Sequence, residues 1–492
     1  MNAYFSKINY TWLGLLLLLG ILQPSYSQTK SDTLKIVSGP MVGYTGMREV
    51  QIWMQWKTPN LISSQPSQGK FSLPKQNVHL EFREKPSSLS PVSKPQDSSP
   101  IAKLETSTAM TETYRRTPVY HPNSKTGVLN IPIELLEPGK IYEYKIFVNA
   151  QEIKFETTLE FKTKPLWQFR KDPPNVKFAI GSCNYINEEA YDRPGKIYGL
   201  GYEIFESIRL DQPEFFVWMG DNVYLREADW DSESGILHRY SHTRQNKEMQ
   251  SMLASMFHIA IWDDHDFGPN DASSSFGLNK VVERAFKEFW PDPSYPSKGI
   301  YRTYSWSDID FFLLDNRTFR TANNNYYSKD RSALGKIQKE WLFNALSDSK
   351  ASVKFIVLGG QFINSAKVYE NLSNYEKDRE EILDFIQRMK ISGVVFLSGD
   401  RHHSEMSRLE RGNLYPIYEW TISPLTAGVS TTTQSEPNVH RVKDSFVLDR
   451  VYGLIEVEGV GKDRKIQFTT KNSKGVKLFQ MEIPISSLTK VE

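Results

Sequence analysis

The sequence predicts an α/β protein with a layered sheet core, preceded by an all-β sandwich. Three observations support this fold class. The first third of the chain alternates apolar and polar residues in short runs, which is typical of half-buried strands. The remainder holds near-continuous apolar runs separated by helical patterns, which indicates a sheet covered on both faces. Between the two regions, the prolines of segment 164–174 interrupt regular structure.

Composition and charge limit the function classes. The chain has 492 residues, of which 39% are hydrophobic, and a net charge of +2, so neither nucleic acid nor a membrane surface is an electrostatically favoured partner. Residues 1–27 have the pattern of a signal peptide: Lys7, an apolar run at 13–22, and the small residues Ser25 and Ser27. The run is shorter than the ~20 residues of a membrane span. We therefore expect a secreted or periplasmic protein without a span in the mature chain; a permanent anchor is the alternative.

Residues 30–165 are predicted to form the sandwich. Apolar residues alternate at 50–56, 78–82 and 142–148. A Pro-Gly turn at 138–139 leads into a strand with an early tyrosine, Tyr142, which is the arrangement of a tyrosine corner. This region resembles fibronectin type III domains, and its polar residues do not form motifs. We expect it to be non-catalytic.

Residues 175–492 are predicted to form the catalytic domain. The expected strands lie at 176–180, 215–219, 259–262, 311–314, 353–358 and 394–397, with added strands at 453–458 and 465–470. The expected helices have apolar faces made by Val282, Ala285, Phe286 and Phe289, by Ile337, Trp341 and Ala345, and by Ile382, Phe385, Ile386 and Met389.

Residues that commonly bind metal ions follow these strands directly. They are Cys183; Asp221 and Tyr224; Asp264, His265 and Asn270; and Asp400, His402 and His403. Ligands of α/β sheets bind beyond the carboxyl ends of strands, so we expect these side chains to meet in one crevice. Each residue taken alone has an ordinary explanation, such as a turn, a helix cap or a solvated acidic surface. For Cys183, the chain's single cysteine, the alternative is a small buried apolar residue.

Such a donor set suits more than one divalent or trivalent ion, because it combines oxygen ligands with a thiolate and imidazoles. A metal cluster polarises a phosphoryl group and neutralises developing charge, and the carboxylate of Asp221 can bridge two ions. His265 and His403 are the candidates for protonating a leaving oxygen. Three arginines could hold a phosphate or form structural ion pairs instead; they are Arg244, Arg317 and Arg401.

The order Gly-x-Cys, Gly-Asp-x-x-Tyr, Trp-Asp-Asp-His-Asp, Gly-Asp-x-His-His is similar to that of the PhoD-like alkaline phosphatases, a branch of the calcineurin-like metallophosphoesterases. The resemblance implies a phosphoesterase that hydrolyses small-molecule phosphate esters with a metal-activated water or hydroxide, on a metallophosphoesterase-type core. It implies Fe³⁺ and Ca²⁺ on the ligands Cys183, Asp221, Tyr224, Asp264, Asn270, Asp400 and His402. The sequence departs from the wider superfamily at Gln361, where a histidine ligand is often found.

Alternatives remain for the metal and for the function. The thiol of Cys183 and the phenol of Tyr224 must each lose a proton to bind a metal, which predicts a ferric ion at these two residues. Calcium is expected nearer Asp264, Asp400 and Asn270. A two-zinc site is the competing assignment, because Zn²⁺ accepts thiolate and imidazole. The functional alternatives are a metallohydrolase of other phosphorus esters and a non-catalytic surface or carbohydrate-binding protein, and the intact ligand set argues against the latter.

Overall fold

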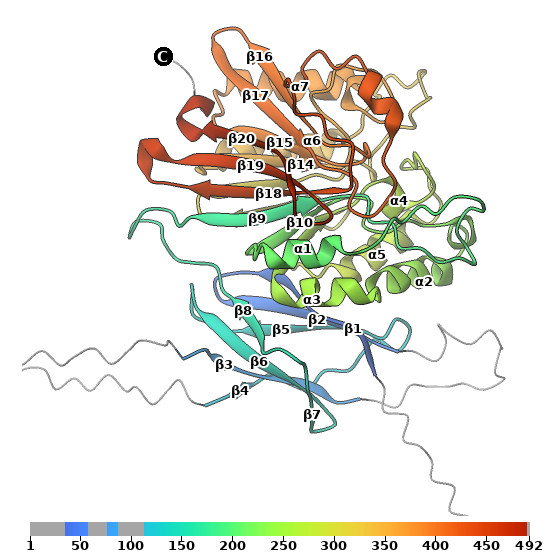
Figure 1. Ribbon diagram of the computed structural model, residues 1–492, viewed down its shortest axis with the longest axis vertical. Helices are drawn as coiled ribbons and strands as arrows, with labels where there is room; N and C mark the ends of the chain where they lie inside the picture. Colours follow the sequence, from blue (N-terminus) through green and yellow to red (C-terminus); the bar gives the residue numbers. More distant parts are fainter. Residues whose placement is uncertain (1–34, 58–75, 87–112, 490–492) are drawn as a thin grey trace, which may run out of the picture. The chain divides into compact units, whose positions relative to one another are not determined.

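The computed structural model describes residues 35–57, 76–86 and 113–489, and the predicted signal peptide lies outside them. The chain forms a mixed α/β protein with three sheets of nine, six and five strands, as the prediction of an α/β fold required (Figure 1). Among the described residues, no helix is long and apolar enough to cross a membrane.

The strands of the N-terminal region are β1 (Ile36–Thr45), β2 (Glu49–Trp56), β3 (Val78–Glu84), β4 (Arg115–Arg116), β5 (Val128–Glu134), β6 (Ile141–Val148), β7 (Gln151–Ile153) and β8 (Leu159–Lys162). The later strands are β9 (Val176–Gly181), β10 (Phe215–Met219), β11 (Phe257–Ile261), β12 (Arg302–Trp306), β13 (Ile309–Leu313), β14 (Val353–Leu358), β15 (Val394–Ser398), β16 (Glu405–Arg411), β17 (Leu414–Thr421), β18 (Val451–Glu458), β19 (Lys465–Asn472) and β20 (Lys477–Pro484). The helices are α1 (Ile204–Leu210), α2 (Glu233–Arg244), α3 (Lys247–Ser255), α4 (Asp264–Phe267), α5 (Asn279–Phe289), α6 (Lys336–Asp348) and α7 (Glu376–Arg388).

The N-terminal strands divide between two sheets. β4, β3, β6 and β7 form one sheet in that order, with β8 also paired to β6, whereas β1, β2 and β5 belong to the nine-stranded sheet. Tyr142 is buried, and its hydroxyl accepts a 2.9 Å hydrogen bond from the Glu137 N–H, five residues upstream. This is the contact expected of a tyrosine corner. The likeness to fibronectin type III domains stays a prediction.

The nine-stranded sheet runs across the predicted domain boundary at 165–175. Its order is β20-β19-β18-β9-β10-β11-β1-β2-β5, so strands from both predicted domains share one sheet. The join is a parallel pairing of β1 with β11, with Val42 opposite Phe257. The linker itself lies between β8 and β9, where it was expected.

The six-stranded sheet, ordered β12-β13-β14-β15-β17-β16, packs against the nine-stranded sheet through aromatic side chains. Phe178 of β9 has its ring centroid 5.2 Å from that of Phe311 on β13 and 5.6 Å from that of Phe355 on β14. Phe215 of β10 lies 5.6 Å from Phe311. Each central sheet therefore uses one face to cover the other sheet; the sequence predicted a covered sheet but did not show that the cover is a second sheet.

All six core strands and the added C-terminal strands form where the sequence placed them. The predicted face of α6 was wrong, because Ile337 is 63% exposed. The buried face of that helix is instead made by Gln338, Lys339, Leu342 and Leu346. Gln338 is buried because its amide group donates to the Asp315 carbonyl and accepts from the Asp315 N–H. In α7, Ile382 and Ile386 are buried as predicted, but the expected apolar residue Met389 is exposed.

Candidate metal centre

Four strand ends position the site. β9, β10 and β11 are parallel neighbours, so the segments that follow them, with Cys183, Asp221 and Asp264, leave the same edge of the sheet. β15, from the second sheet, leads to Asp400 and His402. Because the two sheets are stacked, these loops meet around a cleft of about 340 Å³.

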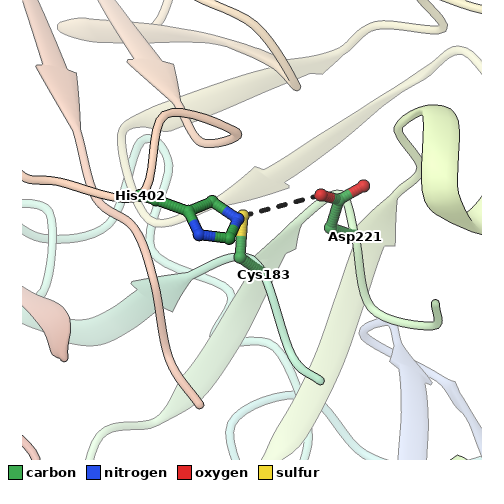
Figure 2. A group of neighbouring side chains, drawn as sticks. All are labelled: Cys183, Asp221 and His402. Carbon is green, nitrogen blue, oxygen red and sulfur yellow. Dashed lines mark hydrogen bonds between the residues drawn. The ribbon is translucent and has the colours of Figure 1, made fainter. Parts of the chain in front are cut away.

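A thiol, a carboxyl and an imidazole group come together at one side of the site (Figure 2). Ligand atoms of Cys183, Asp221 and His402 all lie within 4.8 Å of one another, and the Cys183 Sγ lies 3.6 Å from the Asp221 Oδ2. The Tyr224 hydroxyl lies 3.2 Å from the His402 Nε2. The His402 Nδ1 donates to the Gly428 carbonyl, which can only accept, so the lone pair of the neutral imidazole lies on Nε2 and faces the Tyr224 hydroxyl.

Carboxylates dominate the other side. Ligand atoms of Asp221, Asp264 and His265 form a second group within 4.8 Å, and those of Asp263, Asp264 and Glu370 form a third. The Asp264 Oδ2 accepts from the Asp271 N–H at 2.7 Å, whereas its buried Oδ1 has no hydrogen-bond partner among the described residues. A buried carboxylate oxygen without a partner is costly, and a bound cation would satisfy it.

The electrostatics of the cleft also suit a bound cation. Burial, reinforced by the charge of Asp264, raises the pKa of Asp221 well above its ordinary value. Burial, followed by the charge of Asp400, raises the pKa of the Cys183 thiol to about 12, and burial with the charge of Asp221 raises the pKa of Tyr224. Without positive charge these groups stay protonated. Metal binding deprotonates them and turns the same cluster into a ligand set, so the residues fit the predicted metal ions.

The structure brings most of the predicted site residues to the cleft. Those lining it are Asp221, Tyr224, Asp264, His265, Asn270, Asp400, Arg401 and His402. Cys183 is fully buried beside Asp221. The His265 ring stacks on that of Tyr224 at 4.3 Å between centroids, and its backbone N–H donates to the Asp221 Oδ1 at 3.3 Å.

Besides Cys183, which is buried next to Asp221, three predicted residues lie outside the cleft lining, and the structure does not place them at the site. His403 is fully buried, with its Nε2 3.6 Å from the Glu405 Oε1 and its ring stacked on Phe446, so its side chain points away from the cleft. Arg317 is also fully buried and is bound by Asp263 and Glu370.

Arg244 lies still further from the chemistry, among aromatic side chains. Its guanidinium carbon is 4.8 Å from the ring centroid of Trp53 and 4.0 Å from that of Trp290. The predicted alternative, a structural ion pair, is therefore found for Arg317, whereas Arg244 packs on aromatic rings and has no ion pair among the described residues.

Gln361 does not supply a replacement for the missing histidine ligand. Its amide nitrogen donates to the Glu405 Oε1 at 2.8 Å and to the Thr421 Oγ1 at 2.9 Å, and its oxygen accepts from Asn364. These bonds hold the side chain behind the cleft.

Sequence reasoning did not single out every residue that lines the cleft; among those left out are Lys196, Asp271, Tyr369 and Glu370. Asp271 follows the motif around Asp264 and could have been included on that ground. Lys196, Tyr369 and Glu370 lie in loops without any motif, and only the fold brings them to the site.

The fold and this cleft define a layered α/β protein with a cluster of potential metal ligands beyond the ends of its strands. A solved purple acid phosphatase from yellow lupin (Lupinus luteus) seeds shares the fold with a TM-score of 0.60 at 12% identity, over 90% of this chain and 74% of that one. A solved structure of PhoD has a TM-score of 0.67 at 18% identity, over 92% and 91% of the two chains.

The chain belongs to the PhoD-like phosphatase family, whose model matches residues 178–451. It is also 26% identical over 342 residues to alkaline phosphatase D of Bacillus subtilis (strain 168), a match that covers 60% of this chain. The matched part spans 56% of that relative's length.

Proposed function

We propose that the protein is a secreted, metal-dependent phosphoesterase that acts on small-molecule phosphate esters. The observation that carries this proposal is the cleft itself, where a thiol, a phenol, an imidazole and several carboxyl groups face one another and the Asp264 Oδ1 lacks a partner among the described residues. Membership of the PhoD-like phosphatase family supports the same reaction class.

The ligand set divides into two parts. Cys183, Tyr224 and His402 would hold one ion and Asp264, Asn270 and Asp400 another, with Asp221 between them. The thiol and phenol favour Fe³⁺ on the first part and the oxygen donors favour Ca²⁺ on the second, with Zn²⁺ as the alternative. Bound metal ions would polarise the phosphoryl group, activate the attacking oxygen and neutralise developing charge.

His265 is the residue placed to move a proton. Its imidazole lines the cleft, and burial lowers its pKa despite the opposing charge of Asp264. A bound phosphate ester adds negative charge beside the ring and so favours the protonated form. A ring nitrogen of His265 would then hold the proton that passes to the leaving oxygen. Lys196 and Arg401, which also line the cleft, add positive charge toward the phosphate oxygens.

The test combines metal analysis with turnover. Protein purified without chelator should contain bound metal and should hydrolyse an aryl phosphate or the corresponding bis-aryl diester, and chelation should abolish that activity. Asp221→Asn should lower kcat/KM by about 100-fold or more, because it removes a charged ligand. Asp463→Asn, on the exposed surface, is the matched control and should be neutral. Full activity after exhaustive chelation would contradict the proposal.

Export and the N-terminal region complete the proposal. Cleavage of the signal peptide would leave a mature chain that begins near Gln28, which mass spectrometry of the protein from its native host would detect. The fibronectin-like N-terminal sandwich would be non-catalytic, since none of its described residues lines the cleft.

A further inference from the structure

Tyr369 has an unusual place at the mouth of the cleft. It lies in the loop between β14 and α7, its side chain lines the cleft, and it is 63% exposed. Its backbone has a φ of 49°, in the left-handed region. This conformation is unfavourable for a bulky residue, and an exposed ring gains little burial to offset it. Folding alone does not explain a tyrosine at this position.

The ring of Tyr369 is nevertheless held in place. The guanidinium carbon of Arg401 lies 4.5 Å from the ring centroid, which is a cation–π contact. Arg401 is itself fixed by an ion pair with Glu436 and by a 3.3 Å hydrogen bond to the Asn371 Oδ1. On the chain, the next residue is Glu370, which is buried and bound to Arg317. One side of the ring therefore contacts a fixed cation, while much of the residue remains open to solvent.

The mouth of the cleft contrasts with its floor. Asp221, Asp264 and Asp400 make the floor acidic, whereas Tyr369 and the 70% exposed Ile197 add apolar surface to the same cleft. Ile197 comes from the loop after β9 and Tyr369 from a loop after β14, so loops of both sheets contribute apolar surface. A substrate whose phosphate reaches the floor would place its organic group beside these two residues.

We propose that Tyr369 is a specificity-determining residue that stacks on a planar, unsaturated organic group of the substrate, such as an aryl or nucleobase group. The inference rests on the proposed phosphoesterase function and names its substrate class. A rigid aromatic ring that is already ordered loses little conformational entropy when a ligand binds. The strained backbone of Tyr369 holds the ring in this position before binding. Stacking on such a ring tolerates different planar groups, because each presents a π face.

The experiment separates binding from hydrolysis. Calorimetric titration of the metal-loaded protein with phenylphosphonate and with cyclohexylphosphonate compares a planar and a non-planar group of similar size, neither of which can be hydrolysed at its phosphorus–carbon bond. Wild-type protein should bind phenylphosphonate about five- to tenfold more tightly, as expected for one exposed stacking contact. Tyr369→Ala should abolish that preference, and Tyr369→Phe should keep it. Tyr327→Ala removes a 98% exposed ring that does not line the cleft and should change nothing.

A second variant tests the strain in the left-handed backbone of Tyr369. Tyr369→Gly removes the ring but relieves the left-handed conformation, so it should raise the melting temperature while losing the preference for the planar ligand. An unchanged preference in Tyr369→Ala, or an equal loss of affinity for both phosphonates, would overturn the inference. Absence of hydrolysis of any phosphate ester by metal-loaded wild-type protein would instead overturn the proposed function, and the binding comparison would still be valid.

Discussion

Replacing Trp53 by alanine tests whether the N-terminal strands and the metal centre belong to one cooperative unit. Trp53, in β2, is fully buried, and its ring lies 5.6 Å from that of Phe289 and 4.8 Å from the guanidinium carbon of Arg244. The described residues form one compact unit, and β1 pairs with β11 inside it. Loss of this side chain should therefore destabilise the whole unit.

The expected cost follows from three contributions. Removing a buried aromatic ring costs about 3–5 kcal/mol, and loss of the contact with Arg244 adds about 1 kcal/mol. The buried Trp53 Nε1 has no hydrogen-bond partner among the described residues, so removing this donor offsets about 1 kcal/mol of the destabilisation. Trp53→Ala should thus lower the free energy of unfolding by about 3–5 kcal/mol, a large part of the ~5–15 kcal/mol typical of proteins.

Urea unfolding provides the assay, with circular dichroism and residual phosphatase activity as the two probes. Both should shift to the same lower midpoint in Trp53→Ala, while activity without urea stays near that of the wild type because the cleft is untouched. Phe169→Ala removes a fully exposed ring and is the matched control, with no expected shift. In a double-mutant cycle, Trp53→Ala and Arg244→Met should show a coupling of about 1 kcal/mol. Two separate transitions, with activity surviving the first, would refute a single cooperative unit.

Two further predictions concern the metal and the pH. If Tyr224 binds a ferric ion as phenolate, the protein should absorb visible light, and Tyr224→Phe should lose that absorption band. Colourless, active protein that contains zinc and no iron would contradict the iron assignment. Burial alone would raise the pKa of Glu405, but the nearby His403 imidazole and the charge of Arg441 outweigh it and lower the pKa to about 2. The resulting stabilisation is complete above the pKa of glutamate in the unfolded chain, about 4.3, and is lost as the pH falls toward 2. Arg441→Met should therefore weaken the dependence of folding stability on pH in that range, as measured by circular dichroism.

The sequence was most informative where an apolar strand ends in a glycine and an acidic residue. Asp221 and Asp400 were found in this way, because buried parallel strands leave such residues at one edge of a sheet. The stacking of two sheets was not visible in the sequence, since an apolar run is equally consistent with cover by helices or by another sheet. Which strands face each other depends on pairings between residues far apart in the chain.

The failed assignments share a physical cause. His402 and His403 are neighbours, yet one faces the cleft and the other packs on Phe446, and the sequence does not show which way each points. Arg244 was a candidate for holding the phosphate, but it sits at the end of α2 against Trp53 of the N-terminal region. Motif spacing gives proximity along the chain, while the direction of a side chain depends on packing.

Backbone strain explains why the ligands need their glycine neighbours. Cys183, Asp221, Asp400 and His402 have φ values of 58°, 51°, 65° and 55°, all in the left-handed region, which costs about 1–3 kcal/mol per residue. The chain tolerates these turns only if adjacent segments approach closely.

Two glycines permit that approach. A Cβ on Gly220 would lie 2.7 Å from the Asp263 Cβ, and one on Gly399 would lie 2.4 Å from the Ser182 Oγ. Each glycine directly precedes one of the acidic ligands, Asp221 or Asp400. A methyl group at either position would force apart the loops that carry the ligands, without removing a single donor atom. We therefore expect the two glycines to be as necessary to the proposed metal centre as the carboxylates they precede.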